Sequence, residues 1–266
     1  MIKISDLHTD LLTSEIDKKT YLKKNEKWIY SLALAIFRGK RNTEKIKEIL
    51  NEFFYLKKES VYYSLEDAGY LTEENLDEFI FDNLAYISLT WNYENELAYG
   101  AYSSGKLKDK GKRIVTLLNS RKIAIDTAHL SKESFYDLMG IGDRIINSHT
   151  CFSAVNRHER NISDEQIKMI IDKKGIIGLT LVKDFLGDKY KGVDSVVSHV
   201  DYFVSRFNYR YLGLGTDFYG TDKLPKGIKS YRNIDKIVEK LFKLGYNQTV
   251  VDCIIRDNVA NYLKGK

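Results

Sequence analysis

Short apolar runs alternate with amphipathic stretches along most of this 266-residue chain. Compact apolar runs of about four to eight residues, bounded by turn residues, are typical of strands that are buried on both faces. Apolar residues three or four positions apart are typical of helices that pack one side against such strands. The pattern predicts eight strands, which are Ile2–Asp6, Ser31–Phe37, Val61–Leu65, Tyr86–Thr90, Ile123–Ala128, Arg144–Ser148, Gly175–Thr180 and Tyr211–Thr216.

The stretches between these runs predict helices. They are expected over Asn42–Lys57, Leu71–Asn83, Ile234–Leu244 and Val250–Leu263, and after the capping residues Ser131 and Ser163. Strands separated by helices imply a parallel sheet with both faces covered. Eight such strands in a chain of this length predict an α/β fold, a closed (β/α)8 barrel, as a single domain over residues 1–266.

Composition narrows the class of protein. The formal net charge is +5, from 42 Lys and Arg against 37 Asp and Glu, and the basic residues are mixed with acids. The densest basic segment, Lys106–Arg113, contains an aspartate and a glycine, which favours a solvated loop before a helix over a nucleic-acid patch. Cys151 and Cys253 show no metal-type spacing and no disulfide framework, which favours the reducing cytoplasm. We see neither a signal-peptide pattern nor an apolar stretch near the roughly 18 residues of a membrane helix.

Ionisable residues follow five of the eight predicted strands. Asp6, His8 and Asp10 share one face if the first strand continues through them. Parallel strands in a barrel end at one mouth, so residues far apart in sequence meet there. Histidine nitrogens and carboxylate oxygens suit zinc, and this set is large enough for two ions with one shared glutamate. The set is His8 with Asp10, then Glu66, His129, His149 and Asp217.

Each of these residues also has an ordinary interpretation when it is taken alone. Glu66 could be an acid near a helix N-terminus, and either histidine could be a satisfied polar group at a strand end. Asp217 could be a turn residue. The metal interpretation is favoured because five coincidences in register with the strands would otherwise need separate explanations. His158 and His199 fall within helical or loop segments and are not expected to be ligands.

The order and spacing of these motifs resemble the membrane (renal) dipeptidases, zinc metallopeptidases with a barrel fold, and the chain is similar to a short bacterial-type member. The resemblance covers almost the whole chain. It rests on the segments Asp6–Asp10, Glu66, Asp126–Ser131, Ser148–Thr150 with Arg160 and Asn161, Gly213–Phe218, and Asn258.

The resemblance implies a role for each site residue. His8 and Asp10 would bind one zinc ion, His129 and His149 the other, and Glu66 both. Arg160 would hold the free carboxylate of a dipeptide through its planar, charged fork. Asp217 would lie near the substrate amine and the catalytic water. A homodimer is also what the resemblance suggests.

Three features depart from the family pattern. Trp91 stands where the renal members carry a histidine after the fourth strand, and Tyr219 replaces the second aspartate of an Asp-Phe-Asp-Gly motif. The chain is also short for the family. Trp91 either offers its single indole N–H to the substrate while narrowing the pocket, or only packs beneath the polar Asn92–Asn95 loop.

We therefore expect a zinc-dependent dipeptidase that hydrolyses the peptide bond of free dipeptides. A hydroxide bridging two zinc ions would attack the scissile carbonyl, and Asp217 would pass a proton to the leaving amine. The expected partner is a small dipeptide, with no nucleic acid and no membrane. Two alternatives remain: hydrolysis of another small amide, such as an N-acyl amino acid or a lactam, and a non-catalytic protein with a structural metal site.

Overall fold

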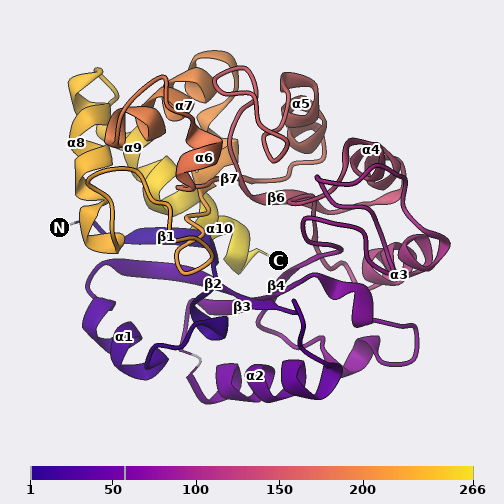
Figure 1. The fold of residues 1–266 in the computed structure, drawn as a ribbon. Helices are drawn as coiled ribbons and strands as arrows, with labels where there is room; N and C mark the ends of the chain where they lie inside the picture. The colour runs from indigo at the N-terminus through magenta and orange to yellow at the C-terminus, as the bar shows by residue number, and fades with distance from the viewer. Residues whose placement is uncertain (1, 57, 266) are drawn as a thin grey trace.

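Eight parallel strands form a closed barrel in the order of the chain (Figure 1). The computed structural model describes residues 2–56 and 58–265. The barrel closes where Asp6 of the first strand pairs with Leu214 of the last. The strands are β1 Ile4–Thr9, β2 Ile29–Phe37, β3 Val61–Glu66, β4 Leu84–Ser88, β5 Ile125–Asp126, β6 Ile145–Thr150, β7 Ile177–Leu179 and β8 Leu212–Leu214.

Helices surround this barrel (Figure 1). The last of them packs against β1, β2 and β8, next to the seam where the barrel closes. The helices are α1 Lys18–Asn25, α2 Thr43–Leu56, α3 Asp109–Ser120, α4 Lys132–Ile141, α5 Asp164–Asp172, α6 Lys183–Leu186, α7 Val193–Arg206, α8 Asp235–Lys243, α9 Gln248–Asp252 and α10 Asn258–Lys264. A π-helical turn, Cys253–Asp257, joins the last two, so the predicted Val250–Leu263 helix is one run with a local widening.

The predicted barrel is confirmed, and all eight predicted strands overlap observed ones. The first strand runs on to Thr9, which places His8 within it. The predicted helix Asn42–Lys57 corresponds to α2, and Lys57 itself lies outside the described residues. The single-domain boundary, 1–266, stays a prediction. None of the described helices is long and apolar enough to cross a membrane.

The helix predicted over Leu71–Asn83 is wrong. This segment holds only a short 3₁₀ turn, Leu76–Glu78, after a second one at Ala68–Tyr70. The Asn75 side chain accepts a hydrogen bond from Thr72 N at 2.7 Å, and Thr72 Oγ1 accepts one from Asn75 N at 3.2 Å. These side chains compete with the backbone bonds that a helix needs. Asn75 therefore completes a reciprocal pair with Thr72 that the sequence pattern did not predict.

Apolar side chains fill the space between strands and helices. Strand residues such as Leu34, Leu65 and Ile87 are fully buried, as are helix residues such as Phe53 and Leu118. A close-packed core of this kind fixes the strands, since the loss of one buried leucine side chain typically costs about 2–5 kcal/mol. The strand ends, and the side chains they carry, are thereby held in defined positions at the mouth of the barrel.

Candidate metal centre

Side chains from four strands or strand ends meet at one carboxylate oxygen. Glu66 Oε1 lies 2.9 Å from His129 Nε2 and 3.9 Å from both His8 Nε2 and His149 Nε2. All four residues are buried. The residues predicted to meet at the mouth therefore do so, although His8 and Glu66 are 58 positions apart in the sequence.

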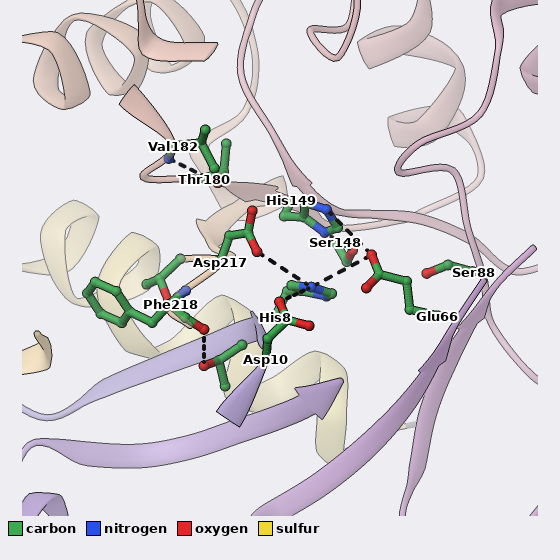
Figure 2. Close-up of polar contacts among 12 residues, drawn as sticks. His8, Asp10, Glu66, Ser88, Ser148, His149, Thr180, Val182, Asp217 and Phe218 are labelled. Carbon is green, nitrogen blue, oxygen red and sulfur yellow. Dashed lines mark hydrogen bonds and ion pairs between the residues drawn. The ribbon is translucent and has the colours of Figure 1, made fainter. Parts of the chain in front are cut away.

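A second group of acids lies on the other side of His8 (Figure 2). His8 Nε2 is 3.4 Å from Asp10 Oδ2 and 3.9 Å from Asp217 Oδ1. The ligand-type atoms of these three residues lie within 4.8 Å of one another, and the same holds for His8, Glu66 and His149. His8 thus belongs to both metal-capable groups of the described residues.

The ring of His8 is oriented by a hydrogen bond on its far nitrogen. Nδ1 lies 2.8 Å from Tyr86 Oη, and the Tyr86 hydroxyl donates to the Leu7 carbonyl at 2.8 Å. Because that hydroxyl hydrogen is used, Nδ1 must be the donor, and the Nε2 of a neutral ring then carries a lone pair. Nε2 has no hydrogen-bond partner among the described residues.

The other two histidines are oriented in the same way. His149 Nδ1 donates to Ser148 Oγ at 2.8 Å, because the Ser148 hydroxyl donates to Asp126 Oδ2 at 2.6 Å. His129 Nδ1 donates to Asn92 Oδ1 at 2.9 Å. Hydrogen-bonded partners of this kind typically fix the tautomer of metal-ligating histidines.

This arrangement fits bound cations. Three ring nitrogens with lone pairs face one carboxylate, and two of them, His129 Nε2 and His149 Nε2, are 2.8 Å apart. Acceptors repel one another at such distances unless a proton or a metal ion lies between them. The donor set of imidazole nitrogen and carboxylate oxygen is the one that zinc and similar divalent ions select.

The charges of the site support the same conclusion. Burial lowers the pKa of His129 and His149 well below the usual value, and nearby cationic groups add to the effect, so both rings stay neutral. Burial raises the pKa of Glu66 and Asp217 well above the usual value, and the adjacent Asp10 carboxylate raises both further. Several carboxylates in one dry site cannot all ionise without a compensating positive charge.

His8 shows the opposite balance. Burial by itself lowers the pKa of His8, but Tyr86 and the carboxylates of Glu66 and Asp10 outweigh it and raise the pKa well above its usual value. The carboxylates around His8 thus favour a positive charge at this point, which a divalent ion can supply.

The backbone brings Asp217 into the site through a tight turn after β8. Asp217 adopts a left-handed backbone conformation with φ 59°, and its N–H donates to the His8 carbonyl at 3.0 Å. Gly220 lies directly behind it: an added Cβ would stand 2.1 Å from Asp217 Oδ1 and 2.3 Å from Asp10 Oδ2. A larger residue there would force one or both carboxylates to shift.

Arg160 is buried, with 4% of its surface exposed, and its charge acts on His129 and His149. Its Nε and Nη2 have no hydrogen-bond partner among the described residues. The guanidinium stacks on the ring of Phe185, 5.4 Å away. Burial lowers the pKa of Arg160, and the carboxylates of Asp217 and Glu66 act in the opposite direction. A pocket of about 180 Å³ opens beside it, and the described lining contains none of the five predicted metal ligands.

Trp91 lies at the rim of the site with 38% of its surface exposed. Its ring is 5.1 Å from the Phe37 ring and 6.1 Å from the His129 ring, measured between centroids. Trp91 is thus partly exposed beside His129, and both the substrate role and packing beneath the Asn92–Asn95 loop stay predictions.

Two other histidines lie apart from the converging groups. His199 is buried in α7, where Nδ1 accepts from Phe152 N and Nε2 donates to the Leu186 carbonyl, both at 3.2 Å. His158 accepts a hydrogen bond from Arg160 N and packs on Phe185. The two metal-capable groups of the described residues contain neither of them, nor His129, which approaches the site through Glu66 and His149.

The residues that orient the histidine rings were not predicted. Asp126 accepts from the Ser88 and Ser148 hydroxyls and from two backbone N–H groups. A signal was present, because Ser88, Asp126 and Ser148 are polar residues inside otherwise apolar strands. Tyr86 gave no such signal, since an aromatic residue is ordinary in a buried strand. Asp6 was expected on the same face as His8 and Asp10, but it belongs to neither metal-capable group of the described residues; its carboxylate accepts instead from Thr216 N and the Tyr231 hydroxyl.

Comparison with known proteins decides the family. A family model described as membrane dipeptidase (peptidase family M19) matches residues 40–265, which is most of the chain. The chain belongs to the membrane dipeptidase family. The resemblance drawn from the motifs is therefore confirmed.

Individual members of the comparison are distant in sequence. The chain is 25% identical to an uncharacterized protein in the pqqA 5′ region of Klebsiella pneumoniae over 216 residues, covering 75% of this chain and 79% of that protein. It is 26% identical to a dipeptidase of Aspergillus oryzae over 187 residues, covering 67% of this chain and 44% of that protein. The chain spans less than half the length of three of the curated relatives that it matches.

Solved structures share the fold of this membrane dipeptidase family member. A metallopeptidase from Rhodobacter sphaeroides, liganded with a phosphinate mimic of the dipeptide L-Ala-D-Ala, superposes with a TM-score of 0.85. The match covers 99% of both chains at 18% identity. At this identity the likeness concerns the barrel fold.

Proposed function

We propose that the protein is a metal-dependent dipeptidase that binds two zinc ions. His8 and Asp10 would hold one ion, His129 and His149 the other, and Glu66 both. The observation that carries this proposal is the convergence of three histidine Nε2 atoms on the Glu66 carboxylate, each with its Nδ1 already used as a donor. When bound, the ions would supply Lewis acidity for the scissile carbonyl and an activated water near neutral pH.

Asp217 would carry the proton in this reaction. Its carboxylate lies beside His8 and Asp10 and is held there by the turn after β8. From that position it can take a proton from the attacking water and pass it to the leaving amine. Glu66 would act chiefly by holding both ions in register.

Arg160 would set the length of the substrate. Its unpaired Nε and Nη2 are buried, so a carboxylate that reaches them gains two charge-assisted hydrogen bonds away from bulk water. The Phe185 ring fixes the plane of the guanidinium. A free dipeptide has its carboxylate one residue beyond the scissile bond, whereas a tripeptide carries it farther away.

Trp91 would form the wall of the substrate pocket on the side of His129. Its half-exposed indole can offer one N–H donor but no charge, and its bulk would favour small side chains. Slower turnover than in the renal members is expected, because loss of one donor to a developing oxyanion typically costs on the order of 100-fold.

The deciding experiment is a hydrolysis screen with the zinc-reconstituted protein. The panel would contain free dipeptides, their C-terminal amides, N-acyl amino acids and lactams, with zinc content measured on the same sample. Cleavage of free dipeptides alone supports the proposal. Cleavage of the N-acyl amino acids or lactams instead would assign another amidase activity, and full zinc occupancy without any cleavage would assign a structural metal site.

Two further expectations concern the state of the protein in the cell. The two cysteines are free thiols, which is compatible with the expected cytoplasmic location. A homodimer is what the resemblance suggests. Sedimentation of the purified protein would test the second expectation directly.

A further inference from the structure

One of the three histidines in the site is held mainly by a loop. His129 lies three residues beyond the end of β5, a strand of only two residues. Its backbone is left-handed, with φ 70°, a conformation that is uncommon for residues other than glycine. His8 and His149, by contrast, lie inside β1 and β6. The strand register alone therefore does not fix His129.

The segment between β4 and α3, residues 89–108, supplies the missing support; we call it the clamp loop. Its far limb pairs with the chain around His129, where Ala101 N donates to the His129 carbonyl at 2.7 Å and Ser131 N donates to the Tyr99 carbonyl at 2.8 Å. The Ser131 hydroxyl also donates to the Gly105 carbonyl at 2.7 Å. These bonds hold the backbone of His129 in its unusual conformation.

The near limb of the clamp loop fixes the ring. Asn92 Oδ1 accepts from His129 Nδ1 at 2.9 Å, and the Asn92 carbonyl accepts from Tyr102 N at 2.9 Å, which ties the two limbs together. The limbs touch at Gly100, where an added Cβ would stand 2.1 Å from the Trp91 carbonyl oxygen and 2.4 Å from Asn92 C. Asn95 anchors the loop from below by donating to Asp67 Oδ1 and to the Leu89 carbonyl, both at 2.8 Å.

We propose that the clamp loop positions His129 and that Asn92 is the positioning residue through which it acts, so that this loop governs one of the two metal positions. The inference rests on the proposed function for its metal assignment. The partners of the other two histidine rings, Tyr86 and Ser148, lie in β4 and β6 and do not depend on the loop. Trp91, the neighbour of Asn92, lines the mouth, so contact with a substrate there would be transmitted to His129.

The test compares Asn92→Leu, which keeps the size of the side chain but removes the acceptor, with Asn92→Asp, which keeps the acceptor. Glu94→Gln is the matched control on the same loop. The Glu94 carboxylate is exposed, and its contact with Lys108 Nζ is a long one of 3.9 Å. Folding of each variant is checked by circular dichroism. Gly100→Ala, which keeps the Asn92 side chain but forces the Asn92 backbone to shift, serves as the second variant.

The first readout is the tautomer of His129 in the metal-free protein, read from ¹⁵N shifts of the histidine rings. We expect an Nδ1–H ring in the native protein, Asn92→Asp and Glu94→Gln, and a mixed population in Asn92→Leu and Gly100→Ala. An unchanged His129 ring in both of the latter variants overturns the proposal. Since no metal is present, this result is independent of whether the protein is a zinc dipeptidase.

The second readout is zinc affinity, measured by competition with a chelator. Loss of a hydrogen-bonded partner of a ligating histidine typically costs about 10- to 100-fold in affinity. We expect this loss for one ion in Asn92→Leu, no change for the other, and recovery in Asn92→Asp. Equal weakening of both ions, or of neither, overturns the assignment of the clamp loop to a single position. A native protein that binds no zinc would instead refute the proposed function.

Discussion

His199 makes folding sensitive to acid in a way that can be calculated. The side chain is fully buried and projects from α7 toward the segment after β6 and the end of α6, where its neutral ring accepts from Phe152 N and donates to the Leu186 carbonyl. Burial lowers the pKa of His199 from 6.5 to about 4. Between those two values the unfolded chain binds a proton that the folded protein does not, so stability falls as the pH falls from 6.5 through 4.

The size of the effect follows from the pKa difference. One pKa unit corresponds to about 1.4 kcal/mol, so the whole window is worth about 3 kcal/mol. Integrating between about pH 7.5 and about pH 5 gives a loss of about 2 kcal/mol from His199. This is a large part of a typical domain stability of about 5–15 kcal/mol.

The perturbation is His199→Gln, whose amide can replace both hydrogen bonds but does not titrate. The measurement is urea unfolding, followed by circular dichroism at about pH 7.5 and about pH 5, on the variant and the native protein. The other four histidines are present in both proteins, so their titration cancels in the difference. We expect the variant to lose about 2 kcal/mol less than the native protein on acidification. Parallel losses in the two proteins would show that His199 is not held neutral by burial, and would refute the reasoning.

Four further predictions concern the site and its rim. Glu66→Ala should weaken both zinc ions by more than the 10- to 100-fold typical of an outer partner, as measured by elemental analysis after dialysis; full occupancy would exclude the shared role. Arg160→Lys should raise KM for free dipeptides by about 10-fold or more, because lysine cannot make the bidentate contact with the carboxylate. Equal rates of the native protein on Ala-Ala and its amide would contradict the assignment of Arg160. Trp91→His and Trp91→Ala should change the rate or the side-chain size preference; if neither does, Trp91 only packs at the rim. The Arg38 guanidinium lowers the pKa of Glu96 to about 2, so this pair stabilises the native protein above pH 4.5, and the stabilisation is lost as the pH falls from 4.5 through 2. Glu96→Gln should remove this stabilisation. Because the pair is partly exposed, the change in unfolding free energy should stay below about 1 kcal/mol.

The strands could be predicted because each is marked by a short apolar run, even where polar residues follow it or interrupt it. Strands buried on both faces need such runs. The helices were harder. Val193–Arg206 was missed because β-branched valines and serines weaken the helical signal, and Lys18–Asn25 because it is almost entirely polar. A helix was wrongly predicted over Leu71–Asn83 because the buried apolar residues of this segment lie on turns and not on a helix.

The positions of the candidate ligands were predictable for a topological reason. In a parallel barrel, the last residue of every strand lies at the mouth, so a residue's place at a strand end predicts where it lies in space. The partners of the histidine rings follow no such rule. Asn92 reaches His129 only because the clamp loop, residues 89–108, folds back on itself, and Tyr86 looks like any core aromatic. The unpaired face of Arg160 also depends on burial, which the sequence around it does not reveal.

The glycine behind the two carboxylates has a consequence for engineering the mouth. At Gly220 every side chain, even a methyl group, would displace Asp10 or Asp217, so a randomised library that includes position 220 would consist mostly of inactive members. The neighbouring Tyr219 is 39% exposed and packs edge-on against Tyr21 of α1. Its replacement alters the rim without entering the carboxylate cluster. Directed evolution of a new specificity in this barrel should therefore vary residue 219 and leave residue 220 fixed.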